Sequence, residues 1–228
     1  MAAKSEGEVA IIDYQAGNLF SVQHACITVG LHCRIISSPN EILNACALIL
    51  PGVGAFGDAM NNLRTLDLIQ PLKDFASSGR PFLGICLGMQ LLFSESEEFG
   101  NVKGLDIVEG RVIRFPEQNE KRKKVKIPHI GWNRIYIPKY NKSWNGTILD
   151  HIKDGEFMYF VHSFYVSPQN INQILSLTNY EGIEFCSAII KENIFATQFH
   201  PEKSAKEGIK IFRNWAAIVK KNKESWLL

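Results

Sequence analysis

The sequence predicts an α/β protein with three layers, in which a mostly parallel central sheet lies between helices and carries an added antiparallel sheet. Two observations support this prediction. In the first half of the chain, short apolar runs alternate with stretches of helical period, and after about residue 107 strand-like runs follow one another. The 228 residues, 46% of them hydrophobic, are enough to bury one substantial core.

The first half predicts strands and helices in alternation. The apolar runs are too short for helices and are bounded by turn signals such as Pro51-Gly52 and Ser77-Ser78-Gly79. Alternation at this spacing favours parallel pairing in a sheet that is covered on both faces. The predicted strands are residues 9–12, 33–36, 47–50 and 81–85, with helices at 18–29 and 60–75 and a turn at 37–40.

The second half predicts mostly strands, followed by one closing helix. The strands are residues 110–115, 135–137, 157–165, 174–177, 185–190 and 194–199. The helix, residues 205–219, places Phe212, Trp215 and Ile218 or Val219 on one face. We expect a single domain over residues 8–219, with flexible ends at 1–7 and 220–228.

Charge and cysteine usage exclude several classes of protein. A net charge of +2 gives no reason to expect nucleic acid or a membrane surface as a partner, and no window approaches the roughly 20 apolar residues of a membrane span. The five cysteines form no CxxC pair, which disfavours a zinc or redox motif. Together with the polar start of the chain, they predict a cytoplasmic location.

Residues 117–126 form a strongly basic segment, with five Lys or Arg against two Glu. One interpretation is a docking or anion-binding loop. The favoured interpretation is the solvated tip of a hairpin, because like charges repel and prefer water.

Cys86 is the predicted nucleophile. It lies between a buried strand and a helix in the segment Gly84-Ile-Cys86-Leu-Gly88, which has the pattern of a nucleophile elbow. The flanking glycines permit the sharp turn, and the free N–H groups at the start of the helix favour the thiolate. Cys26, Cys33, Cys46 and Cys186 lack such a setting and are expected to be structural.

A thiolate that attacks an amide needs a proton donor for the departing nitrogen. His200 provides one, because Pro201 biases it toward an extended conformation at a strand end, and Glu202 can orient its imidazole. The predicted triad is therefore Cys86, His200 and Glu202. His24, His32 and His151 are expected to be structural or exposed.

An oxyanion hole is predicted from the segment Leu50-Pro-Gly-Val-Gly54, which follows a buried strand. A peptide N–H from Gly52 or Val53, with that of Leu87, has the chemistry required. A simple turn at the end of the strand is the alternative interpretation.

These segments together resemble a known family. GICLGMQLLF, LPGVGAFGDAM, IPHIGWN, YFVHSF and QFHPEKS resemble the class I (triad) glutamine amidotransferases, which have a flavodoxin-like fold, and within them the glutaminase subunit of imidazole glycerol phosphate synthase. The resemblance covers nearly the whole chain. It implies hydrolysis of L-glutamine to glutamate and ammonia, with a glutamyl thioester on Cys86 and no metal or organic cofactor.

The resemblance also implies which residues bind the substrate. Gln90 matches a residue that helps to hold glutamine, and the remaining positions of the same pocket are Gly52 and the backbone of His162, Ser163 and Phe164. The family commonly has tyrosine where this chain has Phe164, so a hydroxyl contact is not expected there. Backbone contacts are expected to remain.

The implied partner is a (β/α)8-barrel cyclase, which forms a heterodimer with the glutaminase and uses the ammonia. Asn18, Tyr159 and Lys203 match positions that face the partner or gate the passage of ammonia, and Gln15 stands where glycine is frequent. A sealed interface is needed because ammonia released to water becomes ammonium. Gly52-Val53 is implied to keep the oxyanion hole unformed until the partner is liganded.

Two alternatives remain open at this stage. The first is a paralogous glutaminase that supplies ammonia to an amidotransferase of surface-polysaccharide sugar synthesis, which Phe164, Gln15 and the basic segment weakly favour. The second is a non-catalytic binding module on the same fold, which the complete triad disfavours.

Overall fold

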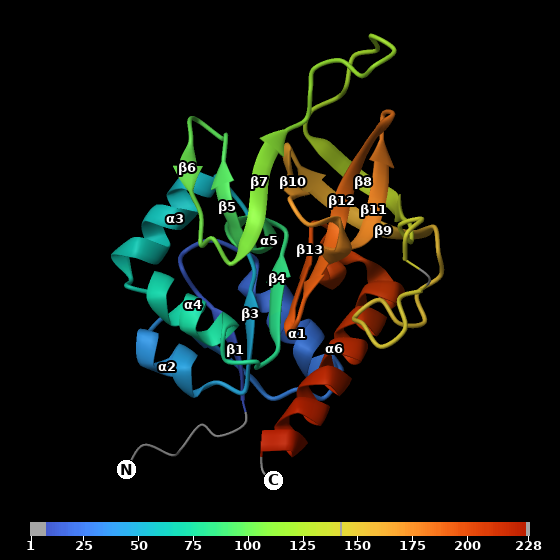
Figure 1. Ribbon diagram of the computed structural model, residues 1–228. Coiled ribbons are helices and arrows are strands. Elements are labelled where there is room, and N and C mark those ends of the chain that lie inside the picture. The colour runs from blue at the N-terminus through green and yellow to red at the C-terminus, as the bar shows by residue number, and fades with distance from the viewer. Residues whose placement is uncertain (1–7, 142, 227–228) are drawn as a thin grey trace.

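The computed structural model describes residues 8–141 and 143–226. Within these residues one sheet of eleven strands runs through the molecule in the order β2-β1-β3-β4-β13-β12-β10-β7-β5-β6, with β11 paired to β12 (Figure 1). Helices cover the sheet on both faces. The predicted α/β class with a parallel central region is thus confirmed.

In the parallel part of the sheet the central strands are buried, and their side chains alternate between two cores. This part contains β1 (Val9–Ile12), β2 (Cys33–Ile36), β3 (Ala47–Leu50), β4 (Phe82–Ile85) and β13 (Ile194–Thr197). Val9 and Ile11 point into one hydrophobic cluster, and Ala10 and Ile12 point into the other. This two-sided burial explains why β1, β3 and β4 are apolar throughout, whereas the edge strand β2 contains the exposed Arg34.

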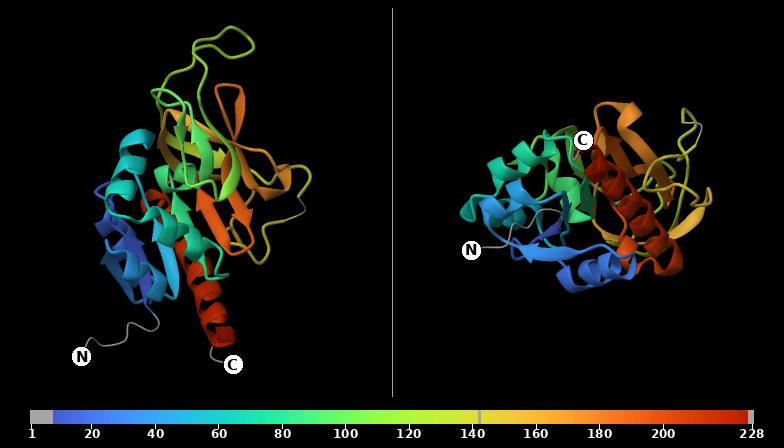
Figure 2. Two further views of the ribbon diagram at one scale, coloured as in Figure 1. Left: turned by 60° about the vertical axis from the view of Figure 1, so that its left-hand side comes forward. Right: turned by 90° about the horizontal axis from the view of Figure 1, so that it is seen from below.

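Two groups of helices cover the two faces (Figure 2). The first cluster receives side chains of α1 (Leu19–Thr28) and α6 (Ala205–Trp226), including the buried Trp215. The second cluster receives side chains of α2 (Pro39–Asn44), α3 (Phe56–Thr65), α4 (Ile69–Ala76) and α5 (Leu87–Leu91). Because the strands of this region are parallel, the turns that lead from their carboxyl ends into the next helices lie at one edge of the sheet. Ligand sites of such folds usually lie at this edge.

The antiparallel strands mostly extend this same sheet. They are β5 (Phe93–Ser96), β6 (Val102–Lys103), β7 (Val108–Arg114), β10 (Phe164–Pro168), β11 (Ile174–Tyr180) and β12 (Ile183–Lys191), although β5 and β7 pair in parallel. A separate two-stranded antiparallel sheet consists of β8 (His129–Ile135) and β9 (Glu156–His162). Two 3₁₀ turns, η1 (Ile171–Gln173) and η2 (Pro201–Lys203), complete the fold.

Some predicted elements differ in their bounds. The helix expected at 60–75 is two helices, because the chain turns at Asp67, whose φ is 54°. The strand expected at 157–165 is broken at Ser163, and the expected turn at 37–40 leads into α2. The strand expected at 135–137 instead runs from His129 to Ile135. Its first residues were not predicted because Gly131 and the polar Asn133 interrupt the apolar pattern of a strand.

The closing helix continues beyond its predicted end. α6 extends to Trp226, so residues 220–226 of the expected flexible end are helical, whereas residues 1–7 and 227–228 lie outside the described residues. Among the described residues, no helix combines the length and the apolar character that crossing a bilayer requires.

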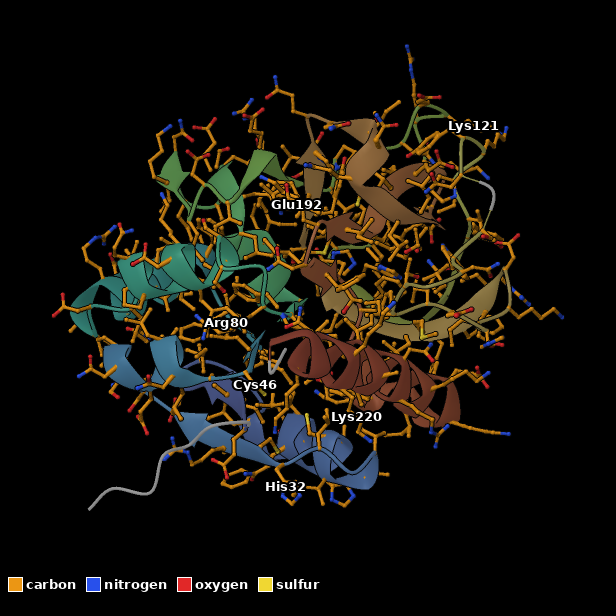
Figure 3. All side chains as sticks on the ribbon, turned by 60° about the horizontal axis from the view of Figure 1, so that its bottom comes forward. His32, Cys46, Arg80, Lys121, Glu192 and Lys220 are labelled. Atoms are coloured by element: carbon orange, nitrogen blue, oxygen red, sulfur yellow. The ribbon has the colours of Figure 1, made fainter. Side chains whose placement is uncertain are left out.

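Arg80 ties together the edge of the sheet that lies away from the strand–helix turns (Figure 3). Its guanidinium donates hydrogen bonds to the carbonyls of Leu43 and Ala45, each at 2.7 Å, and lies 4.1 Å from the ring centroid of Phe75. Burial lowers the pKa of Arg80, and the nearby Cys46 opposes this effect. These bonds anchor the end of α2 next to the start of β4.

The basic segment 117–126 protrudes between β7 and β8 (Figure 1). Gln118 and Lys124 form an isolated antiparallel bridge, and most side chains of the segment are exposed. This is the geometry of the favoured interpretation, a hairpin tip in water.

Candidate active site

Cys86 lies at the junction of β4 and α5 in a strained backbone conformation, with φ 54° and ψ −109°. The glycines on each side are required by close packing. A Cβ on Gly88 would overlap the carbonyl of Leu50, and one on Gly84 would lie 3.0 Å from the Cβ of Ala196. The structure therefore contains the sharp strand–helix turn that the Gly-x-Cys-x-Gly pattern predicts.

His200 follows β13, the neighbour of β4, and faces Cys86. Its Nδ1 lies 2.7 Å from Oε1 of Glu202, which orients the ring, and its backbone N–H donates to the carbonyl of Tyr159. Nε2 makes no hydrogen bond of standard geometry to a described residue. Residues from two distant segments are thus brought together in one buried cluster.

The charge balance of this cluster favours a protonated imidazole. Burial alone lowers the pKa of His200, but the negative charges of Cys86 and Glu202 outweigh it and raise the pKa to about 10. An imidazolium beside a sulfur nucleophile can donate a proton to a leaving nitrogen and recover it later from water.

A cavity of about 430 Å³ opens at Cys86. It is lined by side chains from the strand–helix turns and from β9 and β10, namely Val53, Gly54, Cys86, Leu87, Gln90, Glu98, Pro128, Val161, His162, Ser163, Phe164 and Lys203. This volume suits a small amino-acid-sized molecule. Most of the predicted site residues therefore meet around one cavity.

The predicted oxyanion donors are adjacent, but one of them is occupied. The N–H of Leu87 donates to the carbonyl of Gly52 at 3.4 Å, so the Gly52–Val53 peptide presents its oxygen, and not its N–H, toward α5. The hydroxyl of Tyr14 donates to the carbonyl of Pro51 at 2.7 Å. Tyr14 thereby anchors the segment immediately before this peptide.

Three positions are expected to face a partner or to gate the passage of ammonia, namely Asn18, Tyr159 and Lys203. Lys203 lines the cavity, and Tyr159 bonds through its backbone to both His200 and Ser204. Asn18 caps α1 by accepting the N–H of Ser21 at 3.4 Å, and α1 packs against η2, which ends at Lys203. Lys203 therefore lies at the cavity, whereas Tyr159 and Asn18 are connected to it through contacts with the segment 200–204.

Gln198 is a residue of the site that the sequence did not single out. Its Nε2 donates to Sγ of Cys86 at 3.6 Å, and its Oε1 accepts from Nε2 of Gln90 at 3.1 Å. A signal was present, because a glutamine that ends the buried run Ile194–Thr197 must find hydrogen-bond partners inside the protein.

Gln198→Leu is expected to reduce kcat/KM for glutamine about tenfold or more, because both the sulfur and the Gln90 amide lose a buried partner. Steady-state glutamate formation measures the effect. Gln169→Leu, at an exposed position, is the matched control. Equal kcat/KM in the two variants would show that Gln198 does not contribute to the reaction.

Two buried histidines border the cavity. His162 lines it, and its Nε2 lies 3.0 Å from Nδ1 of His129. Burial lowers the pKa of His129 to about 4. Burial, together with His129 and His200, lowers the pKa of His162 to about 3, although the Phe164 carbonyl opposes this shift. Both rings are therefore neutral at neutral pH.

The histidine pair predicts a loss of stability in mild acid. Below the ordinary histidine pKa of about 6.5, the unfolded chain takes up protons that the folded pair does not. The free energy of unfolding therefore decreases as the pH is lowered from about 6.5 toward the folded pKa values of the two rings. Each ring contributes about 1.4 kcal/mol per pH unit within this window. Urea unfolding at pH 7 and pH 5 measures how the free energy of unfolding changes with pH. In His129→Phe this change should be smaller, because about one proton fewer is taken up on unfolding. An unchanged slope in that variant would contradict the assignment.

A metal site is not formed by the described residues, among which no group of three His, Cys, Asp or Glu side chains could hold an ion. Cys26, Cys33, Cys46 and Cys186 are unpaired and lie outside the cavity. The chemistry of the cavity rests on Cys86, His200 and Glu202 together with its amide groups.

The chain is similar to known proteins along most of its length. The family model of class-I glutamine amidotransferases matches residues 10–218. The chain is 46% identical to the imidazole glycerol phosphate synthase subunit HisH of Syntrophotalea carbinolica, over 91% of this chain and 98% of that protein. It is 45% identical to HisH of Geobacter metallireducens, over 91% and 97%, and to HisH 1 of Legionella pneumophila strain Paris, over 92% and 99%.

Solved structures with low sequence identity share the fold. PurLQS from Thermotoga maritima aligns with a TM-score of 0.69 at 17% identity, covering 93% of this chain and 99% of that one. The glutaminase domain of CTPS from Trypanosoma brucei aligns with a TM-score of 0.62 at 17% identity, covering 94% of each chain. At these identities the likeness concerns the fold alone.

Proposed function

This chain belongs to the class-I glutamine amidotransferase family, and we propose that it is the glutaminase subunit of an imidazole glycerol phosphate synthase in histidine biosynthesis. In this role it hydrolyses L-glutamine to glutamate and ammonia. The observation that carries the proposal is the meeting of Cys86 with the His200–Glu202 pair at a cavity of about 430 Å³.

The first half of the reaction forms a thioester. The sulfur of Cys86 attacks the carboxamide carbon of glutamine, and the carbonyl oxygen takes up negative charge. His200 then gives its Nε2 proton to the nitrogen as the carbon–nitrogen bond breaks, and ammonia leaves. Glu202 holds the ring so that Nε2 faces the sulfur and balances the imidazolium charge.

The second half regenerates the enzyme. With ammonia gone, neutral His200 accepts a proton from a water molecule, and the resulting hydroxide attacks the thioester carbon. The carbon–sulfur bond breaks, and glutamate is released. Gln198, whose amide N–H points to Sγ, supports the sulfur anion in both halves.

The oxyanion hole is proposed to form by rotation of the Gly52–Val53 peptide. That rotation frees the N–H of Leu87 from the Gly52 carbonyl and turns the N–H of Val53 toward the substrate oxygen. One oxyanion donor changes the barrier by about 3 kcal/mol, or the rate by roughly a hundredfold. Basal hydrolysis is therefore expected to be slow until a partner stabilises the rotated peptide.

The proposed partner is a (β/α)8-barrel cyclase that forms a heterodimer with this chain and receives the ammonia. Support comes from the exposed side of β8, where Trp132 is 52% exposed and its ring lies 6.0 Å from that of Tyr159, one of the positions that the resemblance implies to face a partner. Exposed aromatic side chains of this kind are typical anchors of interfaces. A cytoplasmic location is proposed with it, supported by the five free thiols.

The partner is tested by measuring glutamine hydrolysis alone, with a barrel cyclase, and with the cyclase and its ligand. Hydrolysis is expected to rise by roughly a hundredfold or more only with the liganded cyclase. Trp132→Ala should weaken the complex by about 2 kcal/mol in a titration of stimulation against cyclase concentration. Ile171→Ala is the control. Ile171 is exposed and follows the C-terminal end of β10, whereas Phe164 begins that strand. Indifference to the cyclase would contradict the proposed pathway.

A further inference from the structure

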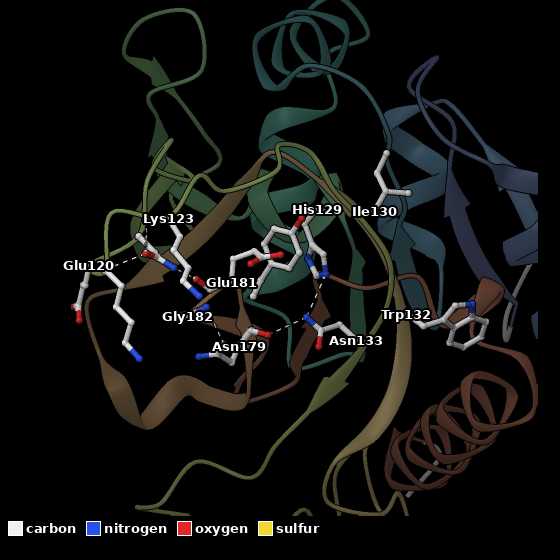
Figure 4. Close-up of a pocket in the computed structure, with 12 residues that line it drawn as sticks. Glu120, Lys123, His129, Ile130, Trp132, Asn133, Asn179, Glu181 and Gly182 are labelled. Atoms are coloured by element: carbon white, nitrogen blue, oxygen red, sulfur yellow. Dashed lines mark hydrogen bonds between the residues drawn. The ribbon is translucent and has the colours of Figure 1, made fainter.

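A second cavity, of about 590 Å³, lies beside the two-stranded sheet of β8 and β9 (Figure 4). It is lined by parts of β8, the basic segment and the turn between β11 and β12, and His129 is among its lining residues. His162 lines the active-site cavity, and the hydrogen bond between the two rings measures 3.0 Å. The pair therefore spans the wall between the cavities.

The hydrogen bonds of this pair fix its tautomers. Nδ1 of His162 lies 2.8 Å from the carbonyl oxygen of Phe164, which can only accept, so Nδ1 carries the hydrogen. Nε2 of neutral His162 is then an acceptor, and Nδ1 of His129 must donate to it. Nε2 of His129 accepts in turn from Nδ2 of Asn133, 3.3 Å away. The three hydrogen bonds therefore form a series: Asn133 donates to His129, His129 donates to His162, and His162 donates to the Phe164 carbonyl.

Stacking holds the His129 ring in place on both faces. Its centroid lies 3.9 Å from that of Tyr180 and 4.9 Å from that of Phe160, with interplanar angles of 27° and 24°. Asn133 also donates to the carbonyl of Asn179 at 3.0 Å, so it is fixed as well (Figure 4). His129 therefore offers its Nδ1 hydrogen from a rigid position.

The same Phe164 carbonyl organises the substrate side of the wall. It accepts a second hydrogen bond from Nε2 of Gln90 at 2.9 Å, and the other N–H of that amide goes to Gln198. Both amide hydrogens of Gln90 are thus directed into the protein. Its Oε1 remains the acceptor for a molecule in the active-site cavity, which Gln90 lines.

We propose that His129 is a positioning residue of the glutamine site: it holds His162 in the tautomer that fixes the Phe164 carbonyl, and through that carbonyl it sets the orientation of Gln90. His129 itself lies outside the cavity that contains Cys86. The inference rests on the proposed function, because it takes glutamine to be the molecule that Gln90 orients. Loss of the donor is expected to weaken glutamine binding more than it slows the chemistry.

Two variants separate the hydrogen bond from the ring. His129→Phe keeps an aromatic ring between Tyr180 and Phe160 but removes the donor, and its KM for glutamine should rise about tenfold with kcat changed less than about threefold. His129→Asn loses the ring but places an amide N–H near the former Nδ1 position, and its KM should return to within about threefold of the parent value. His151→Phe, at an exposed histidine, is the matched control.

A structural role of the ring alone predicts the reverse order, with His129→Asn the more impaired variant. That order, or an unchanged KM in His129→Phe, would overturn the inference.

A spectroscopic measurement on the unaltered protein decides the matter even if a variant fails to fold. Nitrogen NMR of ¹⁵N-histidine-labelled protein should show His129 and His162 as neutral rings with the hydrogen on Nδ1 at pH 7. A hydrogen on Nε2 of His162 would refute the inference, whether or not glutamine is hydrolysed. Conversely, the expected tautomers in a protein that does not hydrolyse glutamine would leave the network intact and reject the proposed function.

Discussion

Cys86→Ala is expected to reduce glutamine hydrolysis by about 10⁵-fold or more, because no other described group at the cavity can form the thioester. The fold should persist, since alanine adopts the backbone conformation of residue 86 with no more strain than cysteine does. The loss that remains is the hydrogen bond from Gln198 to the sulfur. Glutamate formation with the liganded partner present measures activity, and thermal unfolding checks the fold.

Cys46→Ala is the matched control for that experiment. Cys46 is a half-buried free thiol at the edge of the sheet away from the cavity, and its replacement should leave kcat unchanged. Activity retained in Cys86→Ala would mean that another residue is the nucleophile.

His200→Ala is expected to have the second largest effect, a loss of about 10⁴-fold or more in kcat. The sulfur loses the positive charge beside it, and the departing nitrogen loses its proton donor. Because the two residues act as a unit, the double variant with Cys86→Ala should be no worse than Cys86→Ala alone. Additive losses would show that His200 acts separately.

Glu202→Gln tests the third member of the triad. Glutamine can still contact Nδ1 but carries no charge, so the pKa of His200 should fall from its raised value. The alkaline limb of the pH–kcat profile should then move to lower pH, and kcat should drop by roughly 10²-fold to 10⁴-fold. His32→Ala is the control for His200→Ala and for Glu202→Gln. His32 is exposed (labelled in Figure 3), and its replacement should leave activity at the parental level.

The sequence predicted the nucleophile elbow because that geometry follows from local rules. Gly84 and Gly88 are required where a strand turns into a helix with backbones in contact, and few other residues fit there. His200 and Glu202 followed from the proline between them and from the end of a buried strand. The bounds of β1 and β3 were equally accessible, because strands buried on both faces are apolar without interruption.

The features that the sequence did not reveal depend on contacts between distant segments. Gln198 was hidden because its two partners, Cys86 and Gln90, lie about a hundred residues earlier in the chain. The neutral His129–His162 pair results from pairing of β8 with β9, which no local pattern specifies. The occupied N–H of Leu87 reflects the orientation of one peptide, which the residue types Gly52 and Val53 permit in either direction.

The most direct test of the proposed mechanism is the identity of the covalent intermediate. The protein with its liganded partner is mixed with glutamine, quenched with acid during turnover, digested and examined by mass spectrometry. The mechanism predicts a glutamyl group attached to the peptide that contains Cys86 and absent from it in Cys86→Ala. Release of glutamate with no acyl group on that peptide, or with the group on another residue, would contradict it.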